Sequence, residues 1–471
     1  MGLEHLKDIS AIIDDLDAMG RLIRVKTEVD LNLDLAGIAA EFERGPRAVL
    51  FENVKGQKAP VLIGSYWSRE LLGALMRAPE RDLPALVSKH IKKRQIDPVD
   101  PVVLEDGPVR EVTEKKVDVT KLPIPIHATK DGGAYFDAAM VITKDPDTGV
   151  RNASIQRFQV IDKDTLAVNI DSGRHLELYL EKARKKGKHL LFTLNVGIGP
   201  GFHFASSAPA EAAPPEKDEL GIASEFYGEA VELVASDLSE SEMVAHAMYG
   251  LECELLSDQD QMEGPFAEVT GCYAGHAARG MVKVKRIHRR KNPVMHTILP
   301  GTEVHNSVGL LGEANLLSLL QLQVPGVKDV FFTHGGCGFY GAVVQIAQSR
   351  AGWAKQAILA AFAAFPPLKT VTVVDDREYL RSDGCRMGDD HAARPRQGDH
   401  DFPRYIRPRA EPQLSGLSRQ QGRLRCYTAL PAPPGVRTGS NKENVARRAR
   451  YRDAGHYSAE GLMARNANGD T

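Results

Sequence analysis

The stretch MEGPFAEVTG, residues 262–271, places two carboxylates, Glu263 and Glu268, on either side of a Gly264-Pro265 pair. A Gly-Pro pair is typical of a turn, so the sequence predicts a loop here. Taken alone, two glutamates on a loop are most simply solvated surface charges, because glutamate is rarely buried. If they were buried, they could instead act in proton transfer.

Arg157 gives a reason to favour the second interpretation. It lies in the apolar, strand-like segment ASIQRFQV, where an unpaired guanidinium group would be costly to bury. A carboxylate partner would remove that cost, and Glu263 and Glu268 are the candidates.

A second set of residues could bind a metal ion. Asn152, His175 and Glu219 offer an amide oxygen, an imidazole nitrogen and a carboxylate, and such mixed ligands suit Mn²⁺ or Mg²⁺. Their wide separation along the chain does not by itself specify a shared site. In an ideal strand, moreover, Asn152 and Arg157 would face opposite sides. Both reach one site only if the bound group spans the strand end or a bulge intervenes.

Weaker signals lie in three small-residue segments. Ser206 and Ser207, in GFHFASSAPA, could hold a phosphate through hydroxyl and backbone N–H groups, although such segments are commonly linkers. The GIGPG sequence at 197–201 lacks the Rossmann spacing. The HGGCGFYG sequence at 334–341 could line a pocket, but a tight turn between two elements is the simpler interpretation.

Composition excludes several classes of protein. The 471 residues carry 60 basic and 62 acidic side chains, and this balance does not favour binding to nucleic acid or an anionic membrane. Residues 1–20 show an amphipathic helical pattern, not a signal peptide, and no apolar run approaches the ~18 residues of a membrane span. The five cysteines have no CxxC spacing, so neither a disulfide framework nor a zinc ribbon is indicated. We expect a soluble, cytoplasmic protein.

The pattern along the chain predicts an α+β or α/β multidomain protein. Residues 1–110 mix helical patterns with short strands such as AVLFENV and PVLIGS. Residues 111–300 are rich in β-like segments, which favour a barrel or sandwich, with an amphipathic helix at 174–188. Residues 301–376 alternate helix, strand, helix and strand. Residues 377–471 are arginine-rich and poor in aliphatic side chains, so we expect them to be disordered.

Taken together, the segments resemble the UbiD family of reversible, non-oxidative decarboxylases that use prenylated FMN. The resemblance covers about residues 1–376 and rests on the order of GPRAVLFENVKG, LPIPIHATKDGGAYFDAAMVITKDPDTG, NASIQRFQV, EGPFAEVTGCY, HRRKNPVMH and THGGCGFYGAVVQI. It implies an N-terminal α/β domain, a central split β-barrel similar to flavin reductases, and a C-terminal α/β oligomerisation domain. It also implies a homo-oligomer, either a dimer or a hexamer.

The resemblance assigns roles to the residues above. Asn152, His175 and Glu219 would coordinate Mn²⁺ (or Mg²⁺) that bridges to the cofactor phosphate, and K⁺ is a further candidate cation. The remaining contacts to prenylated FMN would come from Ser154, Ile155, Arg157, Arg174, Ser206 and Ser207. A flavin prenyltransferase would supply the cofactor.

Arg157, Glu263 and Glu268 match the Glu-Arg-Glu network of the family, with Ala267 where many members carry glycine. Decarboxylation of an aromatic, heteroaromatic or α,β-unsaturated acid releases CO₂ and leaves a carbanion that must be protonated. We expect Glu268 to deliver this proton. A subunit of a multi-subunit aryl carboxylase is an alternative.

The resemblance stops abruptly near residue 377. Segments beyond it, such as 379–391, become similar to the family's continuation when they are back-translated and read one nucleotide later. We therefore predict a frameshift near Arg377–Tyr379. Such a chain would lack most of the C-terminal domain and could be a catalytically inactive, flavin-binding relic.

Overall fold

The computed structural model describes residues 3, 6–96, 99–208, 217–347, 350–375 and 427–429. These residues belong to two compact units, one built mainly from residues 1–80 and 90–307, the other from 81–89 and 308–440. The first unit contains the predicted barrel domain up to residue 300 and the predicted N-terminal domain except residues 81–89. The boundaries near residues 110 and 300 stay predictions.

The N-terminal part of the first unit is a small sheet with helices. Its strand order is β1 (Leu22–Val25), β2 (Ala48–Phe51), β3 (Val61–Ile63) and β16 (Met295–His296), and its helices are α1 (Ile9–Ala18), α2 (Asp34–Ala40) and α3 (Arg69–Leu75). The strands predicted in AVLFENV and PVLIGS are confirmed. The fourth strand, β16, comes from a distant part of the chain and pairs in parallel with β3.

The first helix shows why this region folds as the pattern predicts. Asp8 caps α1 by accepting a hydrogen bond from the Ser10 amide. The buried side chains Ile9, Ile12, Ile13 and Leu16 recur at helical spacing and form one apolar face. The amphipathic helix expected near the N-terminus is therefore present.

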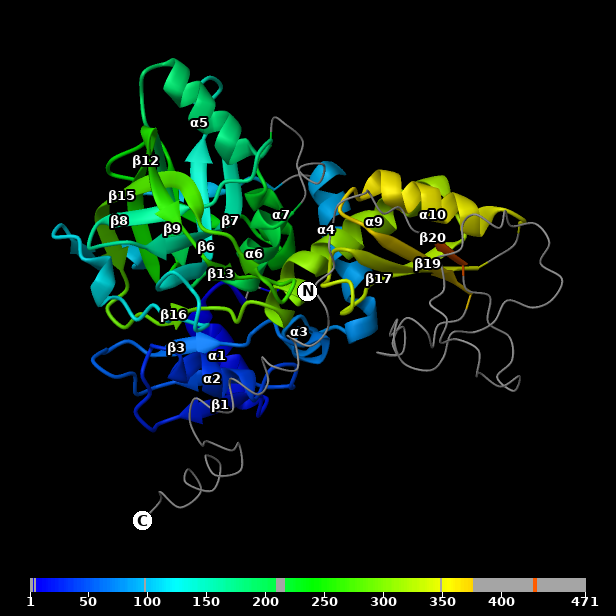
Figure 1. Ribbon diagram of the computed structural model, residues 1–471, viewed down its shortest axis with the longest axis horizontal. Coiled ribbons are helices and arrows are strands. Elements are labelled where there is room, and N and C mark those ends of the chain that lie inside the picture. The colour runs from blue at the N-terminus through cyan, green and yellow to red at the C-terminus, as the bar shows by residue number, and fades with distance from the viewer. Residues whose placement is uncertain are drawn as a thin grey trace, which may run out of the picture. The chain divides into compact units, whose positions relative to one another are not determined.

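A closed antiparallel barrel forms the centre of the first unit (Figure 1). Its strand order is β12 (Tyr249–Glu263), β9 (Leu190–Val196), β6 (Tyr135–Lys144), β7 (Arg151–Val160), β8 (Thr165–Val168) and β15 (Ala277–Arg289). Pairing of β12 with β15 closes the barrel, and β5 (Val112–Glu114) extends it beside β15. The strand pattern in the sequence was compatible with either a barrel or a sandwich. The β12–β15 pairing shows that the domain is a barrel, as the family resemblance implies.

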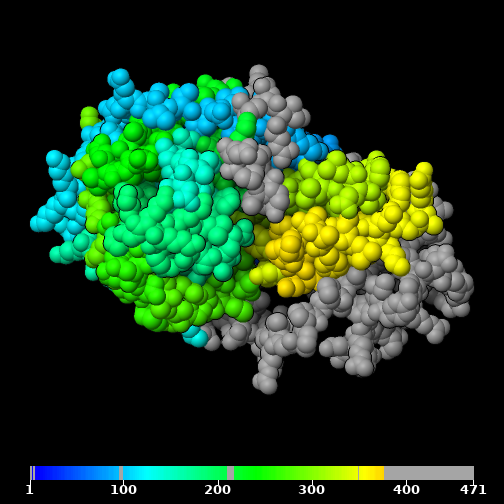
Figure 2. All heavy atoms as spheres, turned by 90° about the horizontal axis from the view of Figure 1, so that it is seen from above, coloured from blue at the N-terminus to red at the C-terminus, as the bar shows by residue number. Residues whose placement is uncertain are grey.

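Shorter elements surround the barrel. They are α5 (His175–Lys185), α6 (Pro200–Ser206), α7 (Leu220–Tyr227), β4 (Val102–Leu104), β10 (Glu232–Ala235), β11 (Glu242–Val244), β13 (Phe266–Ala267) and β14 (Tyr273–Ala274). Helix α4 (Leu83–Ile96) is shared between the two units, because residues 81–89 belong to the second. Helix α5 is the predicted amphipathic helix and lies beside β9 and β12. In the space-filling view, the cyan and green side chains of this region pack closely together (Figure 2).

Short helical turns complete the first unit. They are η3 (Pro108–Arg110), η4 (Val119–Lys121) and α8 (Thr302–Val304). The turn η2 (Glu80–Asp82) and the π-helical turn η6 (His305–Gly309) span the boundaries between the two units. The proline-rich segment KLPIPIH, residues 121–127, begins at the end of η4 and otherwise contains no helix or strand, as its prolines favour.

The second unit contains α9 (Leu310–Gln323), β17 (Val327–Phe332), β18 (Gly341–Ile346), α10 (Trp353–Ala364), β19 (Thr370–Val374) and β20 (Tyr427–Ala429). The predicted alternation of helix and strand needs one correction, because β17 and β18 form an antiparallel hairpin between the two helices. The HGGCGFYG segment is the turn of that hairpin, which agrees with the simpler interpretation of it. Its Cys337 adopts a left-handed φ of 55°.

The predicted frameshift and disordered tail at 377–471 lie outside the described residues, except for β20, which pairs antiparallel with β19. Among the described residues, no helix has the length and apolar character that crossing a membrane requires.

Candidate active site

Arg157 lies between Glu263 and Glu268. Its Nε is 3.1 Å from Oε1 of Glu263, and its Nη1 is 2.7 Å from Oε1 of Glu268. Burial by itself would lower the pKa of Arg157, but the bonds to Glu268 and Glu263 raise it. One guanidinium group therefore stays charged and holds two carboxylates together.

The backbone explains how both glutamates reach Arg157. Glu263 is the last residue of β12, and the cis Gly264-Pro265 peptide follows it. Phe266 and Ala267 then form β13, which pairs with Tyr273 and Ala274 of β14. The prediction of a loop over 262–271 is therefore wrong at both ends of the Gly-Pro pair. The turn is short, because β12 continues to Glu263 and a new hairpin starts at Phe266.

The two carboxylates have different surroundings. The side chain of Glu263 is fully buried, whereas that of Glu268 is 37% exposed. Glu263 also lies 3.2 Å from the hydroxyl of Tyr135, whose pKa is raised by burial and by this carboxylate. Oε2 of Glu263 has no hydrogen-bond partner within the described part of the chain. The arrangement thus combines an inaccessible carboxylate with one that water can reach.

The ring of Phe266 covers the same guanidinium group. Its centroid is 5.1 Å from Cζ of Arg157, within the range of a cation–π contact. Phe266 also packs against Tyr135, with 4.3 Å between the ring centroids. These rings exclude water from one side of Arg157 and strengthen its bonds to the carboxylates.

Asn152 of β7, His175 at the start of α5 and Glu219 before α7 also come together, away from Arg157. Asn152 Oδ1 is 2.7 Å from His175 Nδ1, which is 3.8 Å from Glu219 Oε1. The interaction with the nearby carboxylate of Glu219 raises the pKa of His175. His175 Nδ1 therefore lies near an oxygen atom of each of the other two residues, and all three are ligand types that Mn²⁺ and Mg²⁺ accept. The donor set fits the divalent cation that the family resemblance implies.

Asn152 and Arg157 lie five residues apart on β7, so in an ideal strand they would face opposite sides. Their different partners account for this. Asn152 joins His175 and Glu219, while Arg157 joins Glu263 and Glu268. The only register shift between β6 and β7 lies in β6, between Phe136 and Ala139, opposite Arg157. No bulge in β7 itself is needed, because the two residues serve two neighbouring clusters.

Three of the other predicted contact residues lie near these clusters on the chain. Ser154 and Ile155 lie on β7 between the two clusters, and the Ser154 hydroxyl is buried without a hydrogen-bond partner among the described residues. Arg174 precedes α5, and its side chain is exposed. A buried, unsatisfied hydroxyl such as that of Ser154 is a natural contact for a bound polar group.

Ser206 and Ser207 lie at the C-terminal end of α6. The Ser206 hydroxyl donates to the Phe202 carbonyl at 2.7 Å, and the Ser207 hydroxyl donates to the His203 carbonyl at 2.8 Å. Both hydroxyl hydrogens are therefore already used within the helix. To donate to a phosphate, each hydroxyl would have to rotate away from its carbonyl.

Ion pairs that the sequence does not reveal support the metal candidates. Asp218, next to Glu219, pairs with Arg151, next to Asn152. Asp218 also lies 3.6 Å from Arg94, a guanidinium group that is 1% exposed. Arg151 continues the network to Glu242 at 3.0 Å. No motif marks these residues, because their separation in the sequence hides their contacts.

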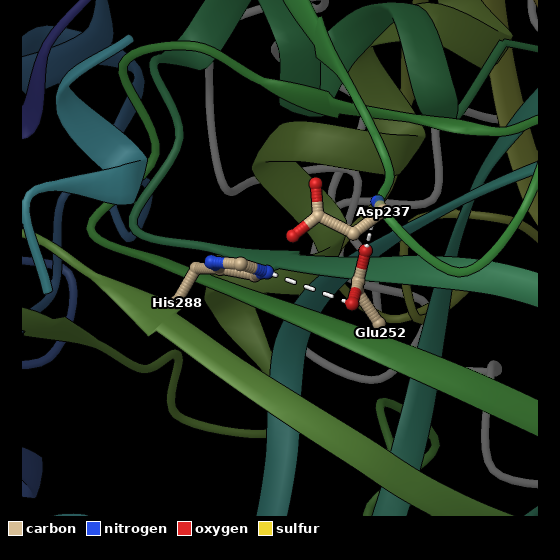
Figure 3. A group of neighbouring side chains, drawn as sticks. All are labelled: Asp237, Glu252 and His288. Carbon is tan, nitrogen blue, oxygen red and sulfur yellow. Dashed lines mark hydrogen bonds and ion pairs between the residues drawn. The ribbon is translucent and has the colours of Figure 1, made fainter. Parts of the chain in front are cut away.

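A third cluster, formed by Asp237, Glu252 and His288, also has the residue types of a metal site (Figure 3). Its charges argue against one. Asp237 Oδ2 is 2.6 Å from Arg286 Nη1, and its Oδ1 is 3.0 Å from Arg110 Nη2. Two guanidinium groups therefore already neutralise the two carboxylates, and a divalent cation would be repelled. We interpret this cluster as a structural ion-pair network of the barrel.

Three family models match the chain in succession. They describe the N-terminal domain of 3-octaprenyl-4-hydroxybenzoate carboxy-lyase at residues 13–90, its Rift-related domain at 102–303 and its C-terminal domain at 305–382. The chain belongs to the UbiD family. The named members are carboxy-lyases, so this UbiD protein is an enzyme of that class. The C-terminal match extends five residues beyond Arg377.

Relatives agree with this assignment. The chain is 66% identical over 377 residues to the "uncharacterized protein in cooM 5'region" of Rhodospirillum rubrum, covering 80% of this chain and 81% of that one. It is 33% identical to the anhydromevalonate phosphate decarboxylase of Methanothermobacter thermautotrophicus, over 77% of this chain and 83% of that one. Among solved structures, an evolved dimeric form of the UbiD-class enzyme HmfF from Pelotomaculum thermopropionicum, in complex with prFMN, is similar with a TM-score of 0.73. The identity is 35%, over 78% of this chain and 85% of that one.

Proposed function

We propose that this UbiD protein uses prenylated FMN to catalyse the reversible decarboxylation of an aromatic, heteroaromatic or α,β-unsaturated carboxylic acid, releasing CO₂. The observation that carries the proposal is the bridge from Arg157 to Glu263 and Glu268. When bound, the modified flavin supplies an electron sink for the electron pair that remains after CO₂ leaves. The complex of HmfF with prFMN supports this choice of cofactor.

Glu268 is the better of the two carboxyl groups for delivering a proton. When the bond from the substrate to its carboxylate breaks, the vacated carbon must accept a proton, which a carboxyl group can provide. The donor must then recover a proton from water, and only Glu268 is exposed enough to do so. Glu263 is buried beneath Arg157 and Tyr135, so it is better suited to fixing the guanidinium group.

Arg157 has two roles in this scheme. It holds both carboxylates, and its positive charge can orient the carboxylate of the substrate. In the reverse direction, the same residues would remove the proton before CO₂ adds.

Asn152, His175 and Glu219 would hold Mn²⁺ or Mg²⁺ next to the phosphate of the cofactor. Their donor atoms already converge without it. Ser154, Ile155, Arg174, Ser206 and Ser207 would provide the remaining contacts, with the two serine hydroxyls rotating away from their carbonyls. The substrate class has two supports: the family models name a hydroxybenzoate carboxy-lyase, and one relative is a decarboxylase of anhydromevalonate phosphate.

The test begins with co-expression with a flavin prenyltransferase, followed by a visible spectrum and a screen for CO₂ release from aromatic and alkenoic acids. We expect Glu268→Gln to keep the bound flavin but to lose decarboxylation and solvent hydrogen–deuterium exchange at the substrate carbon. Glu254→Gln is the matched control, since Glu254 lies on β12 but pairs with Lys285 at 2.6 Å. A fully active Glu268→Gln enzyme would refute the role of Glu268. Flavin binding without turnover by the unmodified chain would favour the inactive relic.

A further inference from the structure

Residues 263–274, which carry Glu263 and Glu268 and include the β13–β14 pair, are called the catalytic hairpin below. A further segment of the first unit lies against it. Residues 128–133 precede β6, and their backbone meets the Gly264–Ala267 stretch directly. The Gly132 amide donates to the Pro265 carbonyl at 2.7 Å. The Ala267 amide donates to Oδ1 of Asp131 at 2.9 Å. Two bonds therefore fix the backbone between Glu263 and Glu268.

Asp131 is itself held in place. Its second oxygen, Oδ2, accepts a hydrogen bond from the Ala128 amide at 2.9 Å. Both carboxylate oxygens thus serve backbone amides, one in its own segment and one in the catalytic hairpin. A neutral amide side chain could satisfy only one of the two, because its nitrogen cannot accept from an N–H group.

Gln159 joins the same two segments from the barrel wall. It lies two residues after Arg157 on β7 and therefore on the same face of the strand. Its Oε1 accepts from the Gly264 amide at 2.9 Å, and its Nε2 donates to the Gly132 carbonyl at 2.8 Å. Arg157 binds the side chains of the hairpin while Gln159 binds its backbone.

The close approach of the two segments leaves no room for a side chain at Gly132. A Cβ atom there would lie 2.3 Å from the Gly264 carbonyl oxygen and 2.7 Å from Gln159 Nε2. The Tyr135 hydroxyl completes the group, 3.1 Å from Gln159 Oε1 and 3.2 Å from Glu263 Oε1. It has one hydrogen and can donate to either oxygen.

We propose that Asp131, Gln159 and Tyr135 form a clamp of positioning residues that holds Glu263 and Glu268 against Arg157. The proposal rests on the proposed function, because it explains how the proposed proton donor is kept in place. Glu268 follows the two-residue strand β13 and is partly exposed, so its position depends on how the backbone of that strand is held. A displacement of about 1 Å at a reacting group can lower the rate about 100-fold.

The experiment compares the holoenzyme with three variants: Asp131→Asn, Gln159→Leu and Tyr135→Phe. Tyr249→Phe is the control, because Tyr249 is a buried tyrosine at the other end of β12. Hydrogen exchange read by mass spectrometry reports the backbone over 262–274, independently of activity. We expect exchange there to become about tenfold faster in Asp131→Asn and Gln159→Leu, with the rest of the barrel unchanged.

In kinetics we expect kcat to fall between about 10-fold and 100-fold in these two variants, with KM and flavin content within about twofold of wild type. Tyr135→Phe should lower kcat without faster exchange, since it removes a contact to a side chain only. Unchanged exchange over 262–274 in both Asp131→Asn and Gln159→Leu would overturn the clamp. Faster exchange throughout the barrel would overturn it too, because the residues would then act on global stability.

The two proposals fail in different ways. An active Glu268→Gln enzyme would reject Glu268 as the proton donor. The exchange measurement would still show whether the clamp exists. Conversely, an inactive Glu268→Gln enzyme together with unchanged exchange in the clamp variants would leave the function standing and reject the clamp.

Discussion

Arg151 and Asp218 form an ion pair that joins strand β7 to the residue preceding Glu219. Each partner lies next to a proposed metal ligand, since Arg151 precedes Asn152 and Asp218 precedes Glu219. The pair therefore fixes the distance between two ligands that are far apart in the sequence. Residues that orient metal ligands in this way commonly affect affinity as strongly as some ligands do.

The first prediction concerns this pair. We expect Asp218→Asn to weaken Mn²⁺ binding by about 10-fold to 100-fold, because the neutral side chain no longer holds Arg151. The measurement is a calorimetric titration of the metal-free protein with Mn²⁺. Asp147→Asn is the control, since Asp147 is a half-exposed partner of Lys186. Equal Mn²⁺ affinity in the Asp218→Asn and Asp147→Asn proteins would contradict the prediction.

The second prediction concerns Arg157. Arg157 uses two different nitrogen atoms, Nε for Glu263 and Nη1 for Glu268. A lysine has a single ammonium group and cannot bind both carboxylates in this geometry. We expect Arg157→Lys to lower kcat by about 100-fold while the protein stays folded. Steady-state kinetics measure kcat, and a thermal melt shows whether the variant is folded. Arg289→Lys, at a surface pair with Glu114, should retain activity, and an Arg157→Lys enzyme with unchanged kcat would show that the bridge is dispensable.

The third prediction concerns the pH dependence of stability. Burial alone would raise the pKa of Glu252, but its interactions with His288, Ser236 and the Asp237 backbone lower it from 4.5 to about 2. A lowered carboxyl pKa stabilises the fold above the unfolded value, and this contribution is lost as the pH falls from 4.5 toward 2.

We therefore expect Glu252→Gln to lose about 3 kcal/mol of unfolding free energy near neutral pH, and the difference from wild type to shrink as the pH falls below about 4.5. Chemical unfolding over a pH series measures this. The control, Glu254→Gln at a more exposed ion pair, should change stability by no more than about 1 kcal/mol. A Glu252→Gln difference that stays constant down to acid pH would argue against a charged Glu252.

The fourth prediction tests the core of the second unit with two leucines on one helix. Leu316 of α9 is fully buried among the side chains of the core, whereas Leu322 of the same helix is 80% exposed. We expect Leu316→Ala to cost about 2–5 kcal/mol, because it removes apolar contacts and leaves a cavity. Leu322→Ala should change stability by less than about 0.5 kcal/mol. Thermal and urea unfolding distinguish the two, and equal losses would show that Leu322 is covered in solution.

Much of the site could be predicted because the residue types themselves restrict the chemistry. A guanidinium group in an apolar strand requires a carboxylate, and the sequence offered Glu263 and Glu268 as its partners. An amide, an imidazole and a carboxylate likewise pointed to a hard divalent cation. By contrast, Asp131, Gln159 and Asp218 look like ordinary surface residues in the sequence, because their role depends on backbone groups or on partners far along the chain.

By itself, the amino-acid sequence determined many of the helices and strands, the family and the residues able to carry the chemistry, since periodicity and side-chain type act locally. The tertiary structure alone decided that β12 pairs with β15 to close the barrel, and that β7 presents Asn152 to one cluster and Arg157 to another. It also decided that Glu263 ends a strand and that Gln159 holds the hairpin behind it. These features depend on strand register and on contacts between distant segments, which local patterns do not encode.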